Sequence, residues 1–330
     1  MIHEYTCSKL IISGEYSALF GSPAIVAAID IYNNIIITEE NSKKITFALI
    51  NLSYNESLFV NELQDLRNDI LLKYKNFLMN KDIIKNVLLC LSDLAKFTVA
   101  NFLHFYNLKI NTGFTIKIDS AIPINSGLGS SAAVIVSILK ALYNFFQIKV
   151  HFEEIFTLAK EAENLQHGYS SGIDLAPIIY HSSIYYCENK FTPINLPPMS
   201  LYIINTGKPK STTGESVAFV KKYFSKSAIW QDFENVTKKI YTAIKNCQID
   251  DIKNLINANH LLLKEIGVIP KVTEKFINSL HFHNIAAKIS GAGSVKGNTA
   301  GIVIALTDNL AKLLDICKNY NYKVLPVHLL

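Results

Sequence analysis

The chain has 330 residues, of which 49% are hydrophobic, and this is enough apolar material for about two domains with a core each. The formal net charge of +5 is small for this length and no block of Lys and Arg occurs, which argues against a nucleic-acid partner. No apolar run reaches the roughly 18 residues of a membrane helix, and the five cysteines are scattered without a CxxC pair. We therefore expect an unprocessed cytoplasmic protein without a membrane partner, a disulfide framework or a zinc site.

The first half of the chain predicts several strands. Residues 5–38 have the pattern of strands joined by turns, with a tight turn at Gly14. Residues 40–75 are polar and rich in Asn, and we expect them to contribute little to the core. The segment FTIKID at 114–119 alternates apolar and polar side chains, which predicts a half-buried strand.

Helices are predicted next, followed by a second unit. Apolar residues recur at helical spacing over 131–146 and over about 152–166. After about residue 195, a second α+β unit is indicated by a strand at 201–205, a helical stretch at about 215–265 and a strand at 301–306.

A loop with two glycines, PINSGLGSS at 123–131, leads directly into the first predicted helix. Gly127 and Gly129 allow the backbone to curl closely around a ligand, and the following helix offers unpaired N–H groups to an anion. Ser130 and Ser131 can cap these N–H groups, or offer a hydroxyl to a phosphate or its magnesium ion. The loop therefore fits a phosphate site or an ordinary capped turn, and it lacks the lysine of a P-loop.

Two carboxylates follow in the segment EAENLQHGYSSGIDLAP. Glu163 continues the buried stripe of the second helix, where a carboxylate needs a cation, and Asp174 follows eleven residues later. The two groups can supply a magnesium site and a general base. Alternatively, Gly168 ends the helix and Asp174 caps the next one. His167 alone fits a packed or helix-ending histidine better than a catalytic one.

Three further signals are weaker. GYSSG matches the nucleophile elbow of α/β-hydrolases, but a helix rather than a strand precedes it, so we disfavour a hydrolase. The glycines in 288–306 precede a strand and also fit a strand-to-strand turn. HFH at 281–283 has the spacing of metal ligands on a strand, but no third ligand is near, and we expect a solvated or structural role.

In this order and spacing, the segments resemble the GHMP kinase superfamily, the small-molecule kinases typified by galactokinase, homoserine kinase, mevalonate kinase and phosphomevalonate kinase. SKLIISGEYSALFGSPAIV resembles the first family motif, PINSGLGSSAA the second and AKISGAGS the start of the third. Within the superfamily, HGYSSGID, INTGKPKST and NANHLLLKEIGV are most similar to the mevalonate kinases. The resemblance covers nearly the whole chain.

The resemblance implies a two-domain α+β GHMP kinase fold. Residues 1–195 would form a ribosomal-protein-S5-like α/β domain for ATP binding and catalysis, and residues 196–330 a ferredoxin-like α+β domain. It also implies ATP- and Mg²⁺-dependent phosphorylation of a small hydroxylated acid, with mevalonate, from the mevalonate pathway of isoprenoid biosynthesis, as the first choice. Phosphomevalonate kinase, another GHMP kinase and a non-catalytic binding relative remain alternatives, and a homodimer is left open.

The resemblance also assigns roles to individual residues. Asp174 matches the catalytic aspartate, Lys9 the lysine that supports the transferring phosphoryl group, and Ser131 and Glu163 the magnesium ligands. The nucleotide loop would comprise Pro123, Gly127, Leu128, Gly129, Ser130 and Ser131. The acceptor side would comprise Glu15, Tyr16, His167, Lys210, Thr212, Gly291 and Ala292.

Two positions depart from the mevalonate kinase pattern. Tyr16 stands where mevalonate kinases usually have His, as in phosphomevalonate kinases, and its phenol can donate a hydrogen bond in place of the imidazole. Lys296 interrupts the third glycine loop, which reads GAGSVKGNTAG. Near the expected acceptor site we find Lys208 and Lys210 but no arginine. Since an additional phosphate normally needs several cations, this scarcity favours mevalonate.

Overall fold

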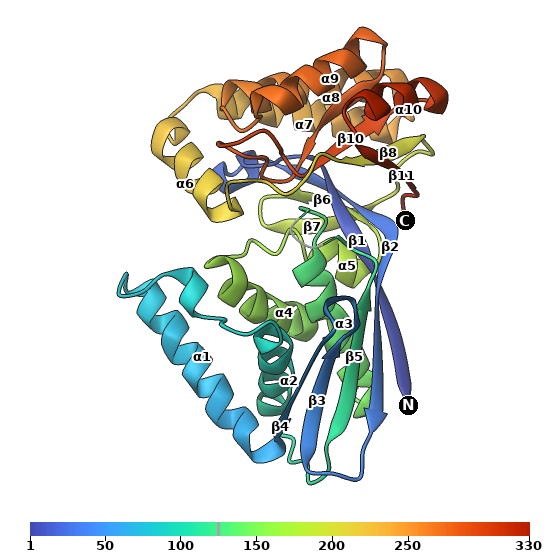
Figure 1. Cartoon of the computed structure of the whole chain (residues 1–330). Coiled ribbons are helices and arrows are strands. Elements are labelled where there is room, and N and C mark those ends of the chain that lie inside the picture. The colour runs from blue at the N-terminus through green and yellow to red at the C-terminus, as the bar shows by residue number, and fades with distance from the viewer. Residues whose placement is uncertain (124–125) are drawn as a thin grey trace. The chain divides into compact units, whose positions relative to one another are not determined.

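The computed structural model describes residues 1–123 and 126–330, so residues 124 and 125 of the predicted phosphate loop lie outside the described part. Contacts divide the chain into two compact units. Figure 1 shows the whole chain, coloured by residue number. The first unit contains Met1–Ser8, Ile31–Ile122 and Ser130–Ile179, and the second contains Lys9–Asp30, Pro123–Gly129 and Tyr180–Leu330. These units interleave along the chain, whereas the division expected at residue 195 is a single cut, and that division stays a prediction.

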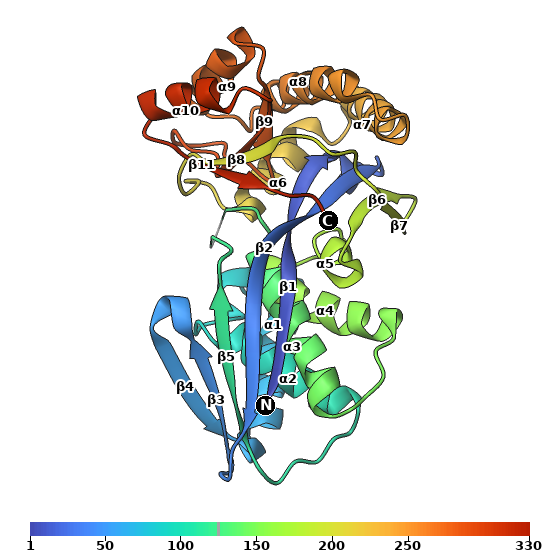
Figure 2. The same cartoon turned by 90° about the vertical axis from the view of Figure 1, so that its right-hand side faces the viewer.

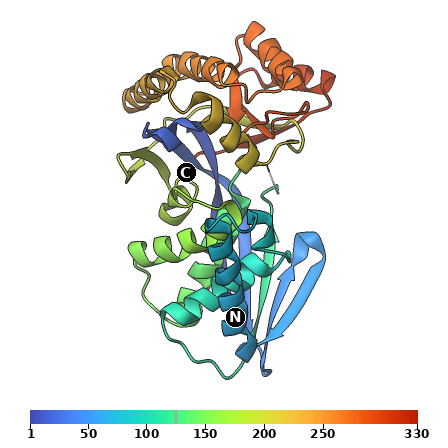
Figure 3. The same ribbon diagram turned by 90° about the vertical axis from the view of Figure 1, so that its left-hand side faces the viewer.

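The first unit is a sheet with helices on one face (Figure 2, Figure 3). Its strand order is β4–β3–β5–β2, and β1 also pairs with β2. β3 and β5 are parallel, while β4–β3 and β5–β2 are antiparallel. The strands are β1 (Ile2–Ser13), β2 (Ala24–Glu39), β3 (Lys44–Leu49), β4 (Tyr54–Phe59) and β5 (Phe114–Ser120). The helices are α1 (Leu63–Leu78), α2 (Asp93–Phe105), α3 (Ser130–Phe145), α4 (Phe152–His167) and α5 (Ala176–Tyr180), with short 3-10 turns η2 (Ile50–Leu52), η3 (Val60–Glu62) and η4 (Ile84–Asn86).

The elements predicted for this unit are confirmed, with one correction. The strand expected at 114–119 is β5, whose Phe114, Ile116 and Ile118 are buried as the alternation requires. The two expected helices are α3 and α4. The expectation that residues 40–75 contribute little to the core is wrong, because Ile45 and Phe47 of β3 are fully buried.

The second unit contains an antiparallel sheet of strand order β11–β8–β10–β9, covered on one face by α7 to α10 (Figure 1). Its strands are β8 (Leu201–Asn205), β9 (Ala286–Ser290), β10 (Ile302–Leu306) and β11 (Lys323–Val327). The helices are α6 (Thr213–Phe224), α7 (Ile229–Lys245), α8 (Ile249–Glu265), α9 (Lys271–Phe282) and α10 (Leu310–Asn319), and η1 (Ser17–Phe20) is a 3-10 turn. The second α+β unit expected after residue 195 is thus present, and the predicted helical stretch consists of α6, α7 and α8.

The first residues of β2 also belong to the second unit, where they pair with a hairpin that is not part of the four-stranded sheet. Ala24, Ile25 and Val26 pair with β6 (Ser183–Cys187), which forms a hairpin with β7 (Lys190–Ile194). The last residues of the chain return to β2, since Ile29 bridges Leu329 and the Leu330 N–H donates to the Ala28 carbonyl at 2.9 Å. Among the residues that the structure describes, no helix combines the length and the apolar character required to cross a membrane.

A buried histidine lies in the helical layer of the second unit. His260 of α8 is fully buried, and neither ring nitrogen has a hydrogen-bond partner within the described part of the chain. Its ring is edge-on to that of His281, at a centroid distance of 5.1 Å. Burial is the main reason that the pKa of His260 falls from 6.5 to about 3. The folded chain therefore favours the neutral imidazole of His260 over the charged imidazolium.

We expect this histidine to make the protein sensitive to acid. Because its folded-state pKa is lowered, its contribution to stability is complete above pH 6.5 and is lost as the pH falls towards 3. Over that range His260 should contribute up to about 1.4 kcal/mol of unfolding free energy per pH unit. Urea unfolding of His260→Leu between pH 7 and pH 4 should show a correspondingly flatter pH dependence. His283→Gln, at an exposed position, should not flatten it, and an unchanged slope in His260→Leu would contradict the assignment.

Candidate active site

The predicted phosphate loop has the tight curl that its glycines suggest. Gly127 and Gly129 have φ values of 88° and 75°, in the left-handed region that favours glycine. A Cβ on Gly129 would lie 2.7 Å from Cγ of Lys9, and one on Gly127 would lie 3.2 Å from the Ser290 carbonyl oxygen. The loop is thus packed against two other segments of the second unit, and glycine is needed at both positions.

Lys9 is positioned by this packing. It lies on β1 with 2% of its surface exposed, and its backbone N–H donates to the Leu128 carbonyl at 3.2 Å. Its aliphatic stem therefore follows the glycine loop. A lysine held beside a loop of this kind is suited to an anionic group, because its charge is already largely removed from water.

The third glycine loop lies beside the second. Gly291 is so near Gly127 that a Cβ on it would be 3.6 Å from the Gly127 Cα. Lys210 packs with its side chain over Gly297, where a Cβ would be 2.9 Å from the Lys210 Cβ. Lys296 is exposed, with its ammonium 3.8 Å from the Glu215 carboxylate. The segments 208–212 and 291–297, which contain predicted acceptor-side residues, are therefore neighbours in the second unit.

Thr212 has a structural function in this region. Its hydroxyl accepts the Glu215 N–H at 3.2 Å, and the Glu215 carboxylate accepts the Thr212 N–H at 2.7 Å. This capping box starts α6. A contact between Thr212 and the acceptor stays a prediction.

The turn of the first motif holds a buried ion pair that the sequence analysis missed. Glu15 has 3% of its surface exposed, and its Oε1 is paired with the ammonium of Lys288 on β9, which is fully buried. Oε2 of Glu15 has no hydrogen-bond partner among the described residues. Burial lowers the pKa of Lys288, while Glu15 acts in the opposite direction. A lysine inside the apolar strand AAKIS was the signal, since lysine is almost never buried unpaired.

Tyr16 fixes the same turn to the third loop. Its phenol donates a hydrogen bond to the Ala292 carbonyl, and its ring belongs to the apolar core of the second unit. Burial raises the pKa of the phenol well above its usual value. The phenol O–H is thus already engaged in a hydrogen bond within the protein. The predicted contact of Tyr16 with the phosphoryl acceptor stays a prediction.

We expect the ion pair to be costly to break from one side. Glu15→Gln leaves the Lys288 ammonium buried without a counter-charge, and this should lower the free energy of unfolding by about 3–5 kcal/mol. The double variant Glu15→Gln/Lys288→Met removes both charges and should regain most of the loss. Urea unfolding followed by circular dichroism measures both effects.

The control for this experiment is an exposed pair of similar chemistry. Lys238 and Glu234 are 2.5 Å apart on the surface of α7, and Glu234→Gln should cause a much smaller loss. If Glu15→Gln were as stable as Glu234→Gln, the buried pair would not have the strength assigned to it.

The first unit holds the predicted metal ligands and the predicted base. Glu163 of α4 has 2% of its surface exposed and accepts a hydrogen bond from the Ser170 hydroxyl. The ring of His167, at the end of the same helix, is 3.5 Å from the Ser131 hydroxyl at the start of α3. α3 thus begins where α4 ends. Both predicted ligands of magnesium lie in these two helices.

Asp174 follows in a turn between α4 and α5. Gly168 ends α4 with φ 83°, and the Gly172 carbonyl accepts the N–H groups of Leu175 and Ala176 at 3.1 and 3.0 Å. The helix end predicted at Gly168 is therefore present. It is compatible with the predicted role of Asp174 as a general base. The hydrogen bond between Ser170 and Glu163 is a contact that the sequence analysis missed.

The donor set fits a magnesium ion. Carboxylate and hydroxyl oxygens are the ligands that Mg²⁺ prefers, and it binds through few protein groups together with substrate phosphates. In the described part of the chain, no group of three or more His, Cys, Asp or Glu side chains could hold a metal ion by itself. Of the residues HFH at 281–283, the first two lie in helix α9 and not on a strand.

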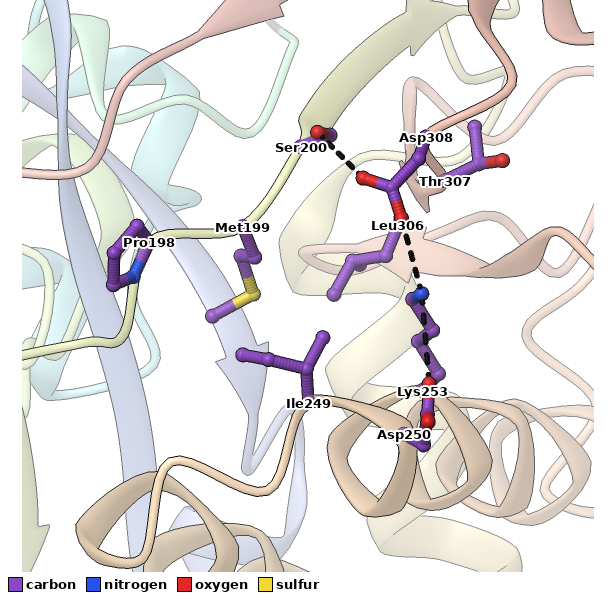
Figure 4. A pocket seen from close by; sticks show the side chains of 9 residues that line it. All are labelled: Pro198, Met199, Ser200, Ile249, Asp250, Lys253, Leu306, Thr307 and Asp308. Carbon is purple, nitrogen blue, oxygen red and sulfur yellow. Dashed lines mark hydrogen bonds and ion pairs between the residues drawn. The ribbon is translucent and has the colours of Figure 1, made fainter.

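A cavity of about 530 Å³ lies elsewhere in the second unit (Figure 4). It is open, and its lining shares no residue with the predicted site. Its charges compensate each other, since the Lys253 ammonium is 3.7 Å from Asp250 and 3.5 Å from Asp308. The lining residues are Pro198, Met199, Ser200, Ile249, Asp250, Lys253, Leu306, Thr307 and Asp308.

Comparison with known proteins gives three findings. Residues 93–182 match the model of the GHMP kinases N terminal domain. The mevalonate kinase of Methanocaldococcus jannaschii is 29% identical, with 96% of this chain and 95% of that protein covered, and the mevalonate kinase of Pyrococcus furiosus is 28% identical, with 92% and 88% covered. The crystal structure of the Methanococcus jannaschii mevalonate kinase is similar with a TM-score of 0.83 at 27% identity, covering 99% of this chain and 98% of that one.

Proposed function

We propose that this chain is a GHMP kinase, and that it is an ATP-dependent enzyme that phosphorylates mevalonate to 5-phosphomevalonate. The observation that carries this proposal is the similarity to mevalonate kinases over nearly the full chain, together with the presence of Lys9, Glu163 and Asp174. A protein that only binds a metabolite has no need of a general base. The ATP-binding and catalytic domain would comprise residues 1–195, and the C-terminal domain residues 196–330.

The proposed reaction divides its functions among these residues. Asp174 accepts the proton of the acceptor hydroxyl, whose oxygen forms a bond to the γ-phosphorus of ATP while the bond to the bridging oxygen of ADP breaks. The glycine loop and the N-terminus of α3 hold the phosphates, and Lys9 stabilises the charge of the transferring group. Ser131 and Glu163 would hold magnesium, which when bound neutralises phosphate charge.

The charges of the chain favour mevalonate over phosphomevalonate. The phosphate that phosphomevalonate carries in addition to its carboxylate needs several cations, and arginines bind it best because they can form two hydrogen bonds each. The whole chain has a single arginine, Arg67 of α1, and its Nε donates to the Asn101 side chain at 2.9 Å. The lysines that remain near the predicted acceptor loops suffice for one carboxylate.

All cysteines in the described residues are free, which fits the cytoplasmic location that we propose.

We expect kcat/KM for mevalonate to exceed that for phosphomevalonate by at least about tenfold, which corresponds to about 1.4 kcal/mol in transition-state binding. Steady-state kinetics with both acceptors at saturating MgATP measures the ratio. Tyr16 is the feature that favours the phosphomevalonate alternative, and a preference for phosphomevalonate would establish it. A folded, ATP-binding protein that is inactive on both acceptors would point to another acceptor or to a binding protein.

We expect Asp174→Asn to keep the fold and ATP binding while kcat falls by about 10² to 10⁴, because the substitution keeps the shape of the side chain and removes the base. Asp119→Asn, at an exposed position of β5, is the matched control and should keep normal turnover. Lys9→Met should also lower kcat, since the charge beside the phosphate loop is lost. Near-normal turnover of Asp174→Asn would remove this residue from the mechanism.

A further inference from the structure

Ser170 connects the end of α4 to the loop that follows it. Its side chain is almost completely buried, and its hydroxyl donates to Oε2 of Glu163. The same hydroxyl oxygen accepts the Gly172 N–H at 3.0 Å, and the Ser170 N–H donates to Oδ1 of Asn164 at 2.7 Å. One residue therefore contacts the carboxylate on the helix and the backbone of the loop at the same time.

The loop around Ser170 is held in place from two sides. A Cβ on Gly168 would lie 2.9 Å from the ring of Phe77, and a Cβ on Gly172 would overlap the ring of Phe156. The phenol of Tyr74 on α1 donates to the Gly168 carbonyl at 2.8 Å. These contacts leave the loop little freedom. The direction in which Ser170 presents its hydroxyl is thus set by packing as well as by hydrogen bonds.

We propose that Ser170 is a positioning residue of the kinase site, acting through Glu163 and the loop that leads to Asp174. The inference rests on the proposed function, which makes Glu163 a magnesium ligand and Asp174 the base. By donating to Oε2, Ser170 fixes the rotation of the Glu163 carboxylate. By accepting from Gly172, two residues before Asp174, it keeps the loop in register with that carboxylate. Residues that orient a metal ligand in this way typically change metal affinity or activity by 10- to 100-fold when removed.

The test compares three variants in the full chain. Ser170→Ala removes the hydroxyl and Ser170→Thr keeps it. Thr157→Ala removes a hydroxyl of helix α4 that donates to the Glu153 carbonyl at 2.7 Å. Binding of Mn²⁺ in the presence of ATP and without acceptor is measured by electron paramagnetic resonance. We expect about tenfold weaker Mn²⁺ binding in Ser170→Ala, with Ser170→Thr and Thr157→Ala within about threefold of the wild type.

A melting temperature for each variant separates positioning from structural support. A purely structural role would lower the melting temperature of Ser170→Ala and leave the Mn²⁺ affinity of the folded protein unchanged, and this result would overturn the proposal. The proposal would also fail if the wild type bound no Mn²⁺ with ATP, or if Thr157→Ala weakened binding equally. If Ser170→Ala did not fold, Ser170→Cys, which keeps a weaker donor, should show an intermediate loss of affinity.

The proposed function and this inference fail in different ways. A wild-type protein that binds Mn²⁺ with ATP but phosphorylates no acceptor would overturn the proposed function. The comparison of Ser170→Ala with Ser170→Thr would still decide whether Ser170 orients the metal ligand.

Discussion

The close approach of three backbone segments in the second unit is the constraint on which the predicted nucleotide side depends. Lys9 of β1, the loop at Gly127 to Gly129 and the strand end at Ser290 are far apart in sequence, yet each touches the next without room for a further methyl group. The buried stem of Lys9 packs along the loop, where a Cβ on Gly129 would lie 2.7 Å from its Cγ. The affinity of such a loop for phosphate follows from the same geometry, since side chains at these positions would keep an anion away from the backbone N–H groups.

Both units contain buried charged side chains. Lys9, Glu15 and Lys288 are buried in the second unit and Glu163 in the first, although burial of charge is unfavourable unless partners compensate it. Lys288 and Glu15 compensate each other, and Ser170 supplies a hydrogen bond to Glu163. In both units, burial of these charged side chains lowers the stability of the fold. In return, the side chains are held in fixed directions before a ligand binds. This arrangement is what phosphoryl transfer requires, because positioning and charge neutralisation account for most of its catalysis.

Much of the fold could be predicted because its signals are local. The alternation in β5, the apolar spacing in α3 and α4 and the glycines of the phosphate loop each occur within a short window of sequence. The contribution of β3 was missed because its neighbours are polar, and its parallel pairing with β5 joins residues about 70 positions apart. The partner of Lys288 was missed for the same reason, since Glu15 lies 273 positions away. Ser170 is only seven positions from Glu163, but the turn after α4 that brings the two side chains together has no sequence signal of its own. A sequence shows that a lysine interrupts an apolar strand, but not which distant carboxylate it meets.

The return of the last residues to β2 has a consequence for synthesis on the ribosome. Ala28 and Ile29 are made early, but their partners are Leu330 and Leu329, and Ala24 to Val26 wait for β6. The second unit therefore cannot complete this pairing until residues 329 and 330 have left the exit tunnel. Until then, the apolar strand at residues 24–29 lacks its native neighbours on that side, and exposed apolar strands of this kind are prone to aggregate.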